Sequence, residues 1–322
     1  GEETPNKYSE PIDKYPFLEQ WSHVQKEQQE GRGNTVGYWR YIKAFWPPQG
    51  AEDSLYNELE MTQSGALERA VWQGETSSLA SLDPAYRSGG DNFQACFGKL
   101  GSMRGVKGLE FAEHFSLLED VKNTDSVLKQ IARQFVAKCR ERKIGVRQTV
   151  VDCTAGGSLM ADAVEDEFGE RGVLRIEFGG SPSDRVVETR DDPVTKKKVN
   201  VTAKEKFGNR ATELWLTGIP FIKSRQLKGI SAAQADQMCS RQAFEKSRKQ
   251  WLESKADYKK RTHKPSPDAA DAAFMLLCLA IERFNFVSEN KLGSAAQPNM
   301  RQAFAKFQVE DASGPQKMTW KG

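Results

Sequence analysis

The segment from Arg261 to Ala280 places the tightest constraint on the fold, because it joins a basic run, a Pro-x-Pro turn and a long apolar stretch. Pro267 is typical of the first turn of a helix, where its missing N–H is not needed. Hardly any polar residue follows between Ala272 and Ile281, so the predicted helix must be buried. The rest of the chain must therefore form a core around it.

Two carboxylates, Asp268 and Asp271, lie three residues apart at the start of this helix and share one face of its first turn. The helix macrodipole favours carboxylates at this end, and Asp268 could simply be a capping residue. Because the helix is buried and follows a basic run, the alternative is a metal site that faces a polyanion. That interpretation requires partner carboxylates elsewhere in the chain.

Composition excludes several classes of protein. The net charge is only +3 over 322 residues, so a nucleic-acid surface must be a local patch. Five widely spaced cysteines indicate no disulfide framework, and with three histidines a zinc site is not expected. The sequence has no P-loop motif, no apolar run long enough to cross a bilayer and no signal-peptide pattern. We therefore expect a reduced, soluble, intracellular protein.

The middle of the chain alternates between strand-like and helix-like patterns. We predict strands over 77–83, 93–100, 109–117, 148–152 and 173–178. One helix is expected to follow the cap candidates Asn123-Thr124-Asp125 and to run through about Arg142, and another spans 158–168. The first three strands form an antiparallel meander, and the later strands join through helices and are therefore parallel. The sequence thus predicts a mixed α/β sheet flanked by helices.

The region after this core is expected to begin with an inserted β-hairpin over 185–201. Its second arm carries Lys196, Lys197 and Lys198, which are either a solvated charge run or an arm that reaches DNA. A helix is predicted over 203–216 and is interrupted at Ile219-Pro220, and a polar helix begins at Ser231.

Composition also divides the chain into three parts. Residues 1–76 are polar and rich in aromatics, and predict a helical or irregular preamble whose rings pack rather than stack on bases. Residues 77–287 contain the predicted sheet domain. Residues 288–322 are rich in Ser, Asn, Gln and Gly and predict a weakly ordered tail.

Acidic residues recur at the ends of predicted elements: Asp83 after the first strand, Asp152 after the fourth, and Asp268 and Asp271 at the helix start. Sites in such sheets lie at the carboxyl ends of strands. Hard ions such as Mg²⁺ bind carboxylate oxygens, and two ions can hold the attacking water and the leaving oxygen of a phosphodiester. A set of aspartates with few histidines suits this chemistry better than that of a serine or cysteine hydrolase.

Basic residues are densest between Arg241 and Lys264, where Trp251 and Tyr258 are interleaved, and this is the strongest electrostatic indication of nucleic-acid binding. Together with the hairpin arm, this region supplies the predicted DNA contacts: Lys196, Lys197, Lys198, Lys255, Lys259, Lys260, Arg261 and Lys264.

Four motifs are spread over roughly residues 77–285. They are Leu82-Asp83-Pro84-Ala85 with Gly89-Gly90-Asp91, Val150-Val151-Asp152 with Gly156-Gly157, an Asn-x-x-Ala-x-x-Trp pattern over 209–215, and Ser266-Pro267-Asp268-Ala269-Ala270-Asp271-Ala272 after the lysine-rich 255–260. With these motifs the chain resembles the C-terminal nuclease domain of tailed-bacteriophage terminase large subunits, and the last motif is the most specific.

The resemblance implies an RNase H-like fold in which Asp83, Asp152 and Asp268 are catalytic metal ligands. Asp271 would be a fourth or supporting carboxylate, and Asp91 is a weaker candidate. It also implies an endonuclease that uses Mg²⁺ or Mn²⁺, with two ions, to cut concatemeric double-stranded DNA during viral packaging. The location would be the cytoplasm of an infected bacterial host.

The resemblance further implies three partners: the terminase ATPase motor, the small terminase subunit and the portal. No motor sequence is present, so residues 1–76 would be the junction that follows it, and the chain would be a nuclease-bearing fragment. No membrane partner is expected.

Two alternatives stay open. One keeps the fold and changes the substrate, as in a junction resolvase or an RNA-strand nuclease, although the Asn-x-x-Ala-x-x-Trp pattern and the hairpin insertion count against it. The other is a non-catalytic DNA-binding packaging adaptor, in which the aspartates are helix caps and the basic run binds phosphates. Metal-dependent cleavage would separate this adaptor from a nuclease.

Overall fold

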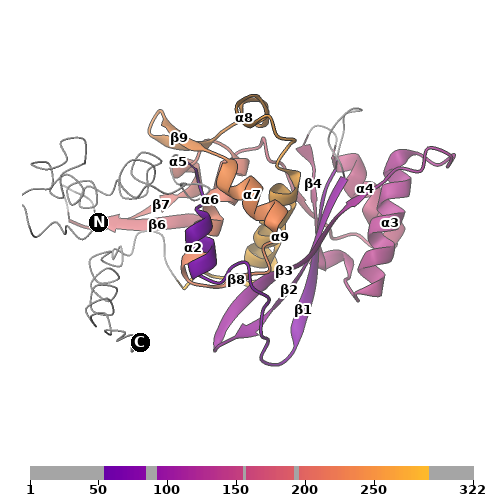
Figure 1. Ribbon diagram of the computed structural model, residues 1–322, viewed down its shortest axis with the longest axis horizontal. Coiled ribbons are helices and arrows are strands. Elements are labelled where there is room, and N and C mark those ends of the chain that lie inside the picture. Colours follow the sequence, from indigo (N-terminus) through magenta and orange to yellow (C-terminus); the bar gives the residue numbers. More distant parts are fainter. Residues whose placement is uncertain (1–53, 85–92, 155–156, 192–195, 290–322) are drawn as a thin grey trace, which may run out of the picture.

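A six-stranded mixed sheet forms the centre of the computed structural model, which describes residues 54–84, 93–154, 157–191 and 196–289 (Figure 1). Its strands lie in the order β5-β4-β1-β2-β3-β8. Their bounds are β1 Thr76–Asp83, β2 Phe93–Met103, β3 Val106–Leu117, β4 Thr149–Asp152, β5 Leu174–Ile176 and β8 Leu227–Lys228.

The pairing within this sheet changes direction at β1. Strands β1, β2 and β3 pair antiparallel, whereas β4 pairs parallel to β1 and β5 pairs parallel to β4. This confirms the predicted RNase H-like sheet of three antiparallel strands followed by parallel ones. The edge strand β8, parallel to β3, was not predicted, because two residues are too short to show a period.

Helices cover both faces of the sheet, as Figure 1 shows. On one face lie α3 (Val127–Glu141) and α4 (Ser158–Phe168), packed on Ala80 and Leu82 of β1. On the other lie α9 (Asp268–Phe284), α6 (Arg210–Lys223) and α7 (Ala232–Ser240), in one core with Leu79 of β1. Successive residues of β1 therefore serve opposite cores, as the pleat of a strand requires.

Helix α9 is the buried helix expected from its apolar sequence. Every residue from Asp268 to Ala280 is buried. Gly98 of β2 lies where the helix crosses the sheet, since a Cβ there would fall 2.5 Å from a methyl group of Leu276. Because position 98 has no side chain, the middle of α9 packs directly against β2.

The predicted helix over 203–216 is instead two helices, α5 (Ala203–Lys206) and α6. Asn209 ends the continuity because it caps α6, accepting a 2.9 Å hydrogen bond from the backbone N–H of Thr212. The expected interruption at Pro220 is wrong, and α6 runs through it to Lys223. Only one helical hydrogen bond is lost there, and burial of Phe221 and Ile222 stabilises the last turn.

Two hairpins extend from this body. The predicted one consists of β6 (Val186–Asp191) and β7 (Lys198–Thr202). The second was not predicted and consists of β9 (Ala243–Lys246) and β10 (Lys249–Leu252), whose basic sequence hides the strand signal. Its turn residues, Ser247 and Arg248, both have positive φ, as a two-residue type I′ turn requires.

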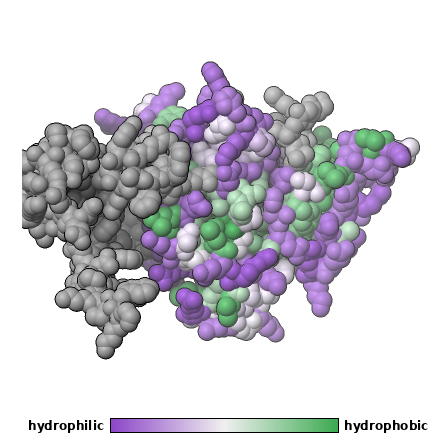
Figure 2. Space-filling model, viewed as in Figure 1, coloured by the Kyte–Doolittle hydropathy of each residue, from purple (hydrophilic) through white to green (hydrophobic). Residues whose placement is uncertain are grey.

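The remaining elements are short. They are α2 (Glu58–Gln63), the 3₁₀ turn Val146–Gln148, and α8 (Lys255–Thr262), which forms a hydrophilic end of the face seen in Figure 2. Residues before the predicted sheet domain also contribute to the core, since Tyr56, Met61 and Ala66 are buried with Leu79.

All five cysteines are free and buried, in agreement with the absence of a disulfide framework. Among the helices of the described residues, none has the length and apolarity needed to span a bilayer. Most of the predicted preamble and tail, residues 1–53 and 290–322, lies outside the described residues.

Candidate metal centre

Three buried aspartates meet at one end of the sheet. Asp83 is the last residue of β1, and Asp268 and Asp271 lie in the first turn of α9. The Ser81 hydroxyl ties the two elements together by donating a 2.7 Å hydrogen bond to the carbonyl of Ala272. As a result, one carboxylate oxygen from each aspartate lies within 4.8 Å of the others.

Asp152 ends the neighbouring strand β4. Val151 pairs with Leu82, so Asp152 and Asp83 occupy equivalent positions at the ends of two parallel strands. One oxygen of Asp152 is fixed by Thr154, whose backbone N–H and hydroxyl donate to it at 2.9 and 2.6 Å. Asp152 lies beside the three-aspartate group rather than within it.

The ammonium of Lys255, at the start of α8, lies among the three carboxylates. Its Nζ is 2.8 Å from Asp271 Oδ2, 3.0 Å from Asp268 Oδ1 and 4.0 Å from Asp83 Oδ2. Burial alone would lower the pKa of Lys255, but the three aspartates raise it above its usual value. The structure therefore places this predicted DNA contact at the centre of the acidic cluster, as a fixed positive charge.

Asp271 is the most firmly held of the aspartates. Its Oδ1 accepts a 2.6 Å hydrogen bond from the indole N–H of Trp215 and a 3.3 Å bond from Arg241. Burial would raise the pKa of Asp271, yet Lys255 and Arg241, with the hydrogen bonds that Asp271 accepts, hold it below its usual value. Asp271 is therefore charged despite its complete burial.

Asp83 Oδ2 and Asp271 Oδ2 are both buried without a hydrogen-bond partner, but the ammonium of Lys255 lies 2.8 Å from Asp271 Oδ2 and 4.0 Å from Asp83 Oδ2. Burial raises the pKa of Asp83 well above its usual value; Lys255 opposes the shift, whereas Asp271, Asp152 and Asp268 add to it. Burial also raises the pKa of Asp152, against the hydrogen bonds from Thr154. A carboxylate oxygen without a partner, among other carboxylates, fits a hard divalent cation, which binds such oxygens.

Asp268 makes no capping hydrogen bond. The residue that precedes α9 is Pro267, and no side chain caps the helix there. Asp268 instead accepts from Lys255 at 3.0 Å. The position of Asp91, the weaker candidate, lies outside the described residues.

The other predicted DNA contacts fall into two groups. Lys196, Lys197 and Lys198 at the start of β7 and Lys260 on α8 are exposed, and Lys259 is half-buried. Arg261 and Lys264 are engaged within the chain: Arg261 donates two 2.7 Å hydrogen bonds to Glu253, and Lys264 lies 2.6 Å from Asp236.

Sequence reasoning missed the site roles of three side chains, Thr154, Trp215 and Arg241. Trp215 stood out only as part of a motif and Arg241 only as part of a basic run. The indole N–H of Trp215 was the one available signal, since a buried indole usually finds a hydrogen-bond partner.

Comparisons with known proteins concern the fold. No family model matches the chain. No curated protein matches it either. The nuclease domain of the large terminase subunit gp2 of bacterial virus Sf6 is similar, with a TM-score of 0.49 and 15% identity over 70% of this chain and 98% of that domain. The human cytomegalovirus terminase nuclease domain has a TM-score of 0.32 and 13% identity over 69% of this chain and 93% of that domain.

Proposed function

We propose that the protein is a metal-dependent DNA endonuclease of a viral DNA-packaging machine, which cleaves concatemeric double-stranded DNA. The observation that carries this proposal is the buried group Asp83, Asp268 and Asp271, in which Asp83 Oδ2 has no hydrogen-bond partner. The group lies where the central strand of an RNase H-like sheet ends, the usual place for a site in such sheets.

The proposed ligands are Asp83, Asp152 and Asp268, with Asp271 as a fourth carboxylate, and the proposed ions are two Mg²⁺ or Mn²⁺. Bound there, such ions would activate a water and stabilise the charge that develops on a phosphodiester. Thr154 holds the Asp152 carboxylate in place. Lys255 supplies a positive charge at the centre of the cluster, which suits a phosphate approaching it.

Exposed cations on α8 and on the two hairpins are the proposed DNA contacts. They are Lys196, Lys197, Lys198 and Lys260, together with Lys246 and Arg248 at the tip of the β9–β10 hairpin. Because the net charge of the chain is small, these local groups must provide the attraction to the DNA backbone. The proposed catalytic domain spans residues 77–287, and the proposed partners are the packaging motor, the small terminase subunit and the portal, in the host cytoplasm.

A non-catalytic DNA-binding adaptor is the second candidate. It is favoured by one observation: Lys255 forms ion pairs with Asp268 and Asp271 and so compensates their charge from within the chain. In an adaptor these contacts would only stabilise the fold, and divalent ions would change neither DNA binding nor thermal stability.

Incubation of supercoiled plasmid with the purified chain in EDTA, Mg²⁺ or Mn²⁺ tests the proposal. We expect nicking and linearisation that require the metal and that disappear in Asp83→Asn and Asp152→Asn. Asp184→Asn, the same change at a surface residue, is the matched control and should cut like the parent. Binding without cleavage under every metal condition would contradict the nuclease and favour the adaptor.

A further inference from the structure

We propose that Trp215 and Arg241 are positioning residues that orient Asp271, so that only one of its oxygens is offered to a metal ion. The inference rests on the proposed function, because it assumes that the aspartates bind a divalent cation. It assigns a role in the site to two side chains on elements other than those that carry the carboxylates.

The two oxygens of Asp271 have different surroundings. Oδ1 accepts from Trp215 at 2.6 Å and from Arg241 at 3.3 Å. Oδ2 faces the cluster and lies 2.8 Å from the ammonium of Lys255. The indole and guanidinium groups are donors only, so they cannot be ligands and they keep Oδ1 occupied. Oδ2 is therefore held in the direction of Asp83, Asp268 and the ammonium of Lys255.

Each donor is held by contacts of its own. Trp215 is fully buried on α6 and packs against Phe274, with 4.8 Å between ring centroids. The Arg241 guanidinium stacks over the Trp215 ring at 4.6 Å, and its Nε and Nη2 both donate to the carbonyl of Glu253. The geometry of Asp271 is thus fixed from two sides by groups that have no freedom to turn away.

Neutralising a buried carboxylate would not require this arrangement. Lys255 already places a positive charge 2.8 Å from Asp271, and burying Arg241 as a second cation is costly unless the geometry of its hydrogen bonds is good. Arg241 is only 4% exposed. Donors that orient a ligand from behind are a regular feature of metal sites, where losing one typically costs about 10- to 100-fold in metal affinity or activity.

Arg241 also joins Asp271 to the β9–β10 hairpin. Arg241 lies two residues before β9, and the carbonyl that it holds belongs to Glu253, directly after β10. Lys255 follows two residues later at the cluster. The base of the hairpin and the orientation of Asp271 are therefore set by the same guanidinium.

Mn²⁺ binding measured by calorimetry, with the Mn²⁺-induced rise in Tm, tests the inference without reference to cleavage. Trp215→Phe removes one donor and keeps a ring. We expect about a 10-fold weaker Kd for Mn²⁺, a smaller rise in Tm and unchanged DNA affinity in EDTA. Trp251→Phe is the matched control, because the Nε1 of Trp251 has no hydrogen-bond partner, and it should bind Mn²⁺ like the parent.

Arg241→Lys keeps the charge but cannot reproduce the stacked guanidinium geometry. If Trp215→Phe fails to fold, the Mn²⁺ affinity of Arg241→Lys tests the positioning role instead. Mn²⁺ affinity equal to the parent in a folded variant would overturn the positioning role. A parent that binds Mn²⁺ but cuts no DNA would contradict the nuclease and leave the comparison of variants valid. A parent that binds no Mn²⁺ would overturn the metal centre and the positioning role together.

Discussion

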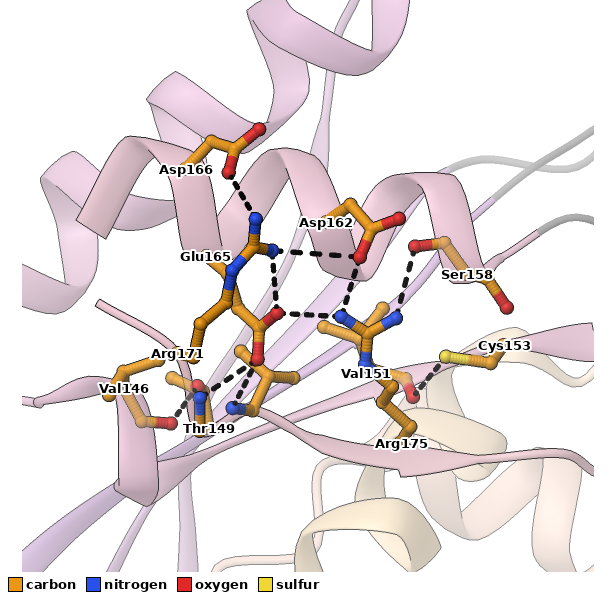
Figure 3. A network of polar contacts seen from close by, with 12 residues as sticks. Val146, Thr149, Val151, Cys153, Ser158, Asp162, Glu165, Asp166, Arg171 and Arg175 are labelled. Atoms are coloured by element: carbon orange, nitrogen blue, oxygen red, sulfur yellow. Dashed lines mark hydrogen bonds and ion pairs between the residues drawn. The ribbon is translucent and has the colours of Figure 1, made fainter. Parts of the chain in front are cut away.

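Two buried carboxylates in this protein have opposite environments. Glu165 of α4 accepts from the backbone N–H groups of Gly172 and Val173 at 2.8 and 3.0 Å. Arg171 and Arg175 donate to its other oxygen at 3.0 and 2.6 Å, as Figure 3 shows. Burial would raise the pKa of Glu165, but these four donors lower it to about 2.

Asp83 is equally buried, yet its Oδ2 has no hydrogen-bond partner and its pKa is raised by burial. The chain satisfies Glu165 completely, and this ties α4 to the start of β5. It leaves Asp83 incomplete next to Asp268 and Asp271. The difference separates a carboxylate that stabilises the fold from one that, in the proposed metal centre, would bind a cation.

The largest effect is expected from Asp83→Asn. Cleavage should fall by more than about 100-fold, beyond the loss expected for a residue that only supports a ligand. The Tm of the metal-free protein at neutral pH should rise by roughly 2–4 °C, since a buried charge without a full set of partners is removed. Plasmid cleavage and a thermal melt measure the two quantities. A variant that is less stable than the parent and still active would contradict the contrast drawn between Asp83 and Glu165.

Glu165→Gln should act in the opposite sense. We expect unfolding to become easier by about 2 kcal/mol, because charge-assisted hydrogen bonds are lost and the partly exposed arginines weaken the effect. Denaturant unfolding measures this change. Cleavage at low temperature should stay at the level of the parent, and loss of cleavage without loss of stability would contradict the structural role of Glu165.

Acid should reduce the stability difference between the parent and each of the two variants, and the two differences have opposite signs. Glu165 has a lowered folded pKa, so its contribution is present above pH 4.5 and disappears as the pH falls from 4.5 toward 2. Asp83 has a raised folded pKa, so its ionisation costs stability at neutral pH and the cost vanishes as the pH falls through that pKa toward 3.8. Melting both variants and the parent from pH 7 to 3 measures the changes. Differences that are constant with pH would contradict these assignments.

The smallest expected effect is on DNA binding, and it concerns two neighbouring cations on α8 that differ in the same way as the two carboxylates. Lys260 is exposed, whereas Arg261 is bound by Glu253. Lys260→Ala should weaken DNA binding for all sequences and reduce the salt slope by about 0.9 for one lost phosphate contact. Arg261→Ala should mainly lower Tm. Salt titrations of DNA affinity separate the two, and equal slopes for both variants and the parent would remove Lys260 from the binding surface.

Most of the sheet could be predicted from sequence, because β1 to β5 are long or apolar enough to show a period and α9 is apolar on all sides. The hairpin over Ala243–Leu252 was missed, since its strands carry Lys246 and Lys249 where apolar alternation is expected. For the site, the chain positions of Asp83, Asp152, Asp268 and Asp271 were visible as element ends. The different surroundings of these aspartates could not be predicted, because their partners Trp215, Arg241 and Lys255 come from three other segments that only the fold brings together.

Anomalous diffraction from a crystal soaked in Mn²⁺ tests most directly whether the aspartate cluster is a metal centre. We predict peaks bonded to Asp83 and to the carboxylates around it, and no peak at the equally buried Glu165. If no anomalous peak is found at the cluster at saturating Mn²⁺, or if peaks lie only on surface carboxylates, the proposed metal centre is contradicted.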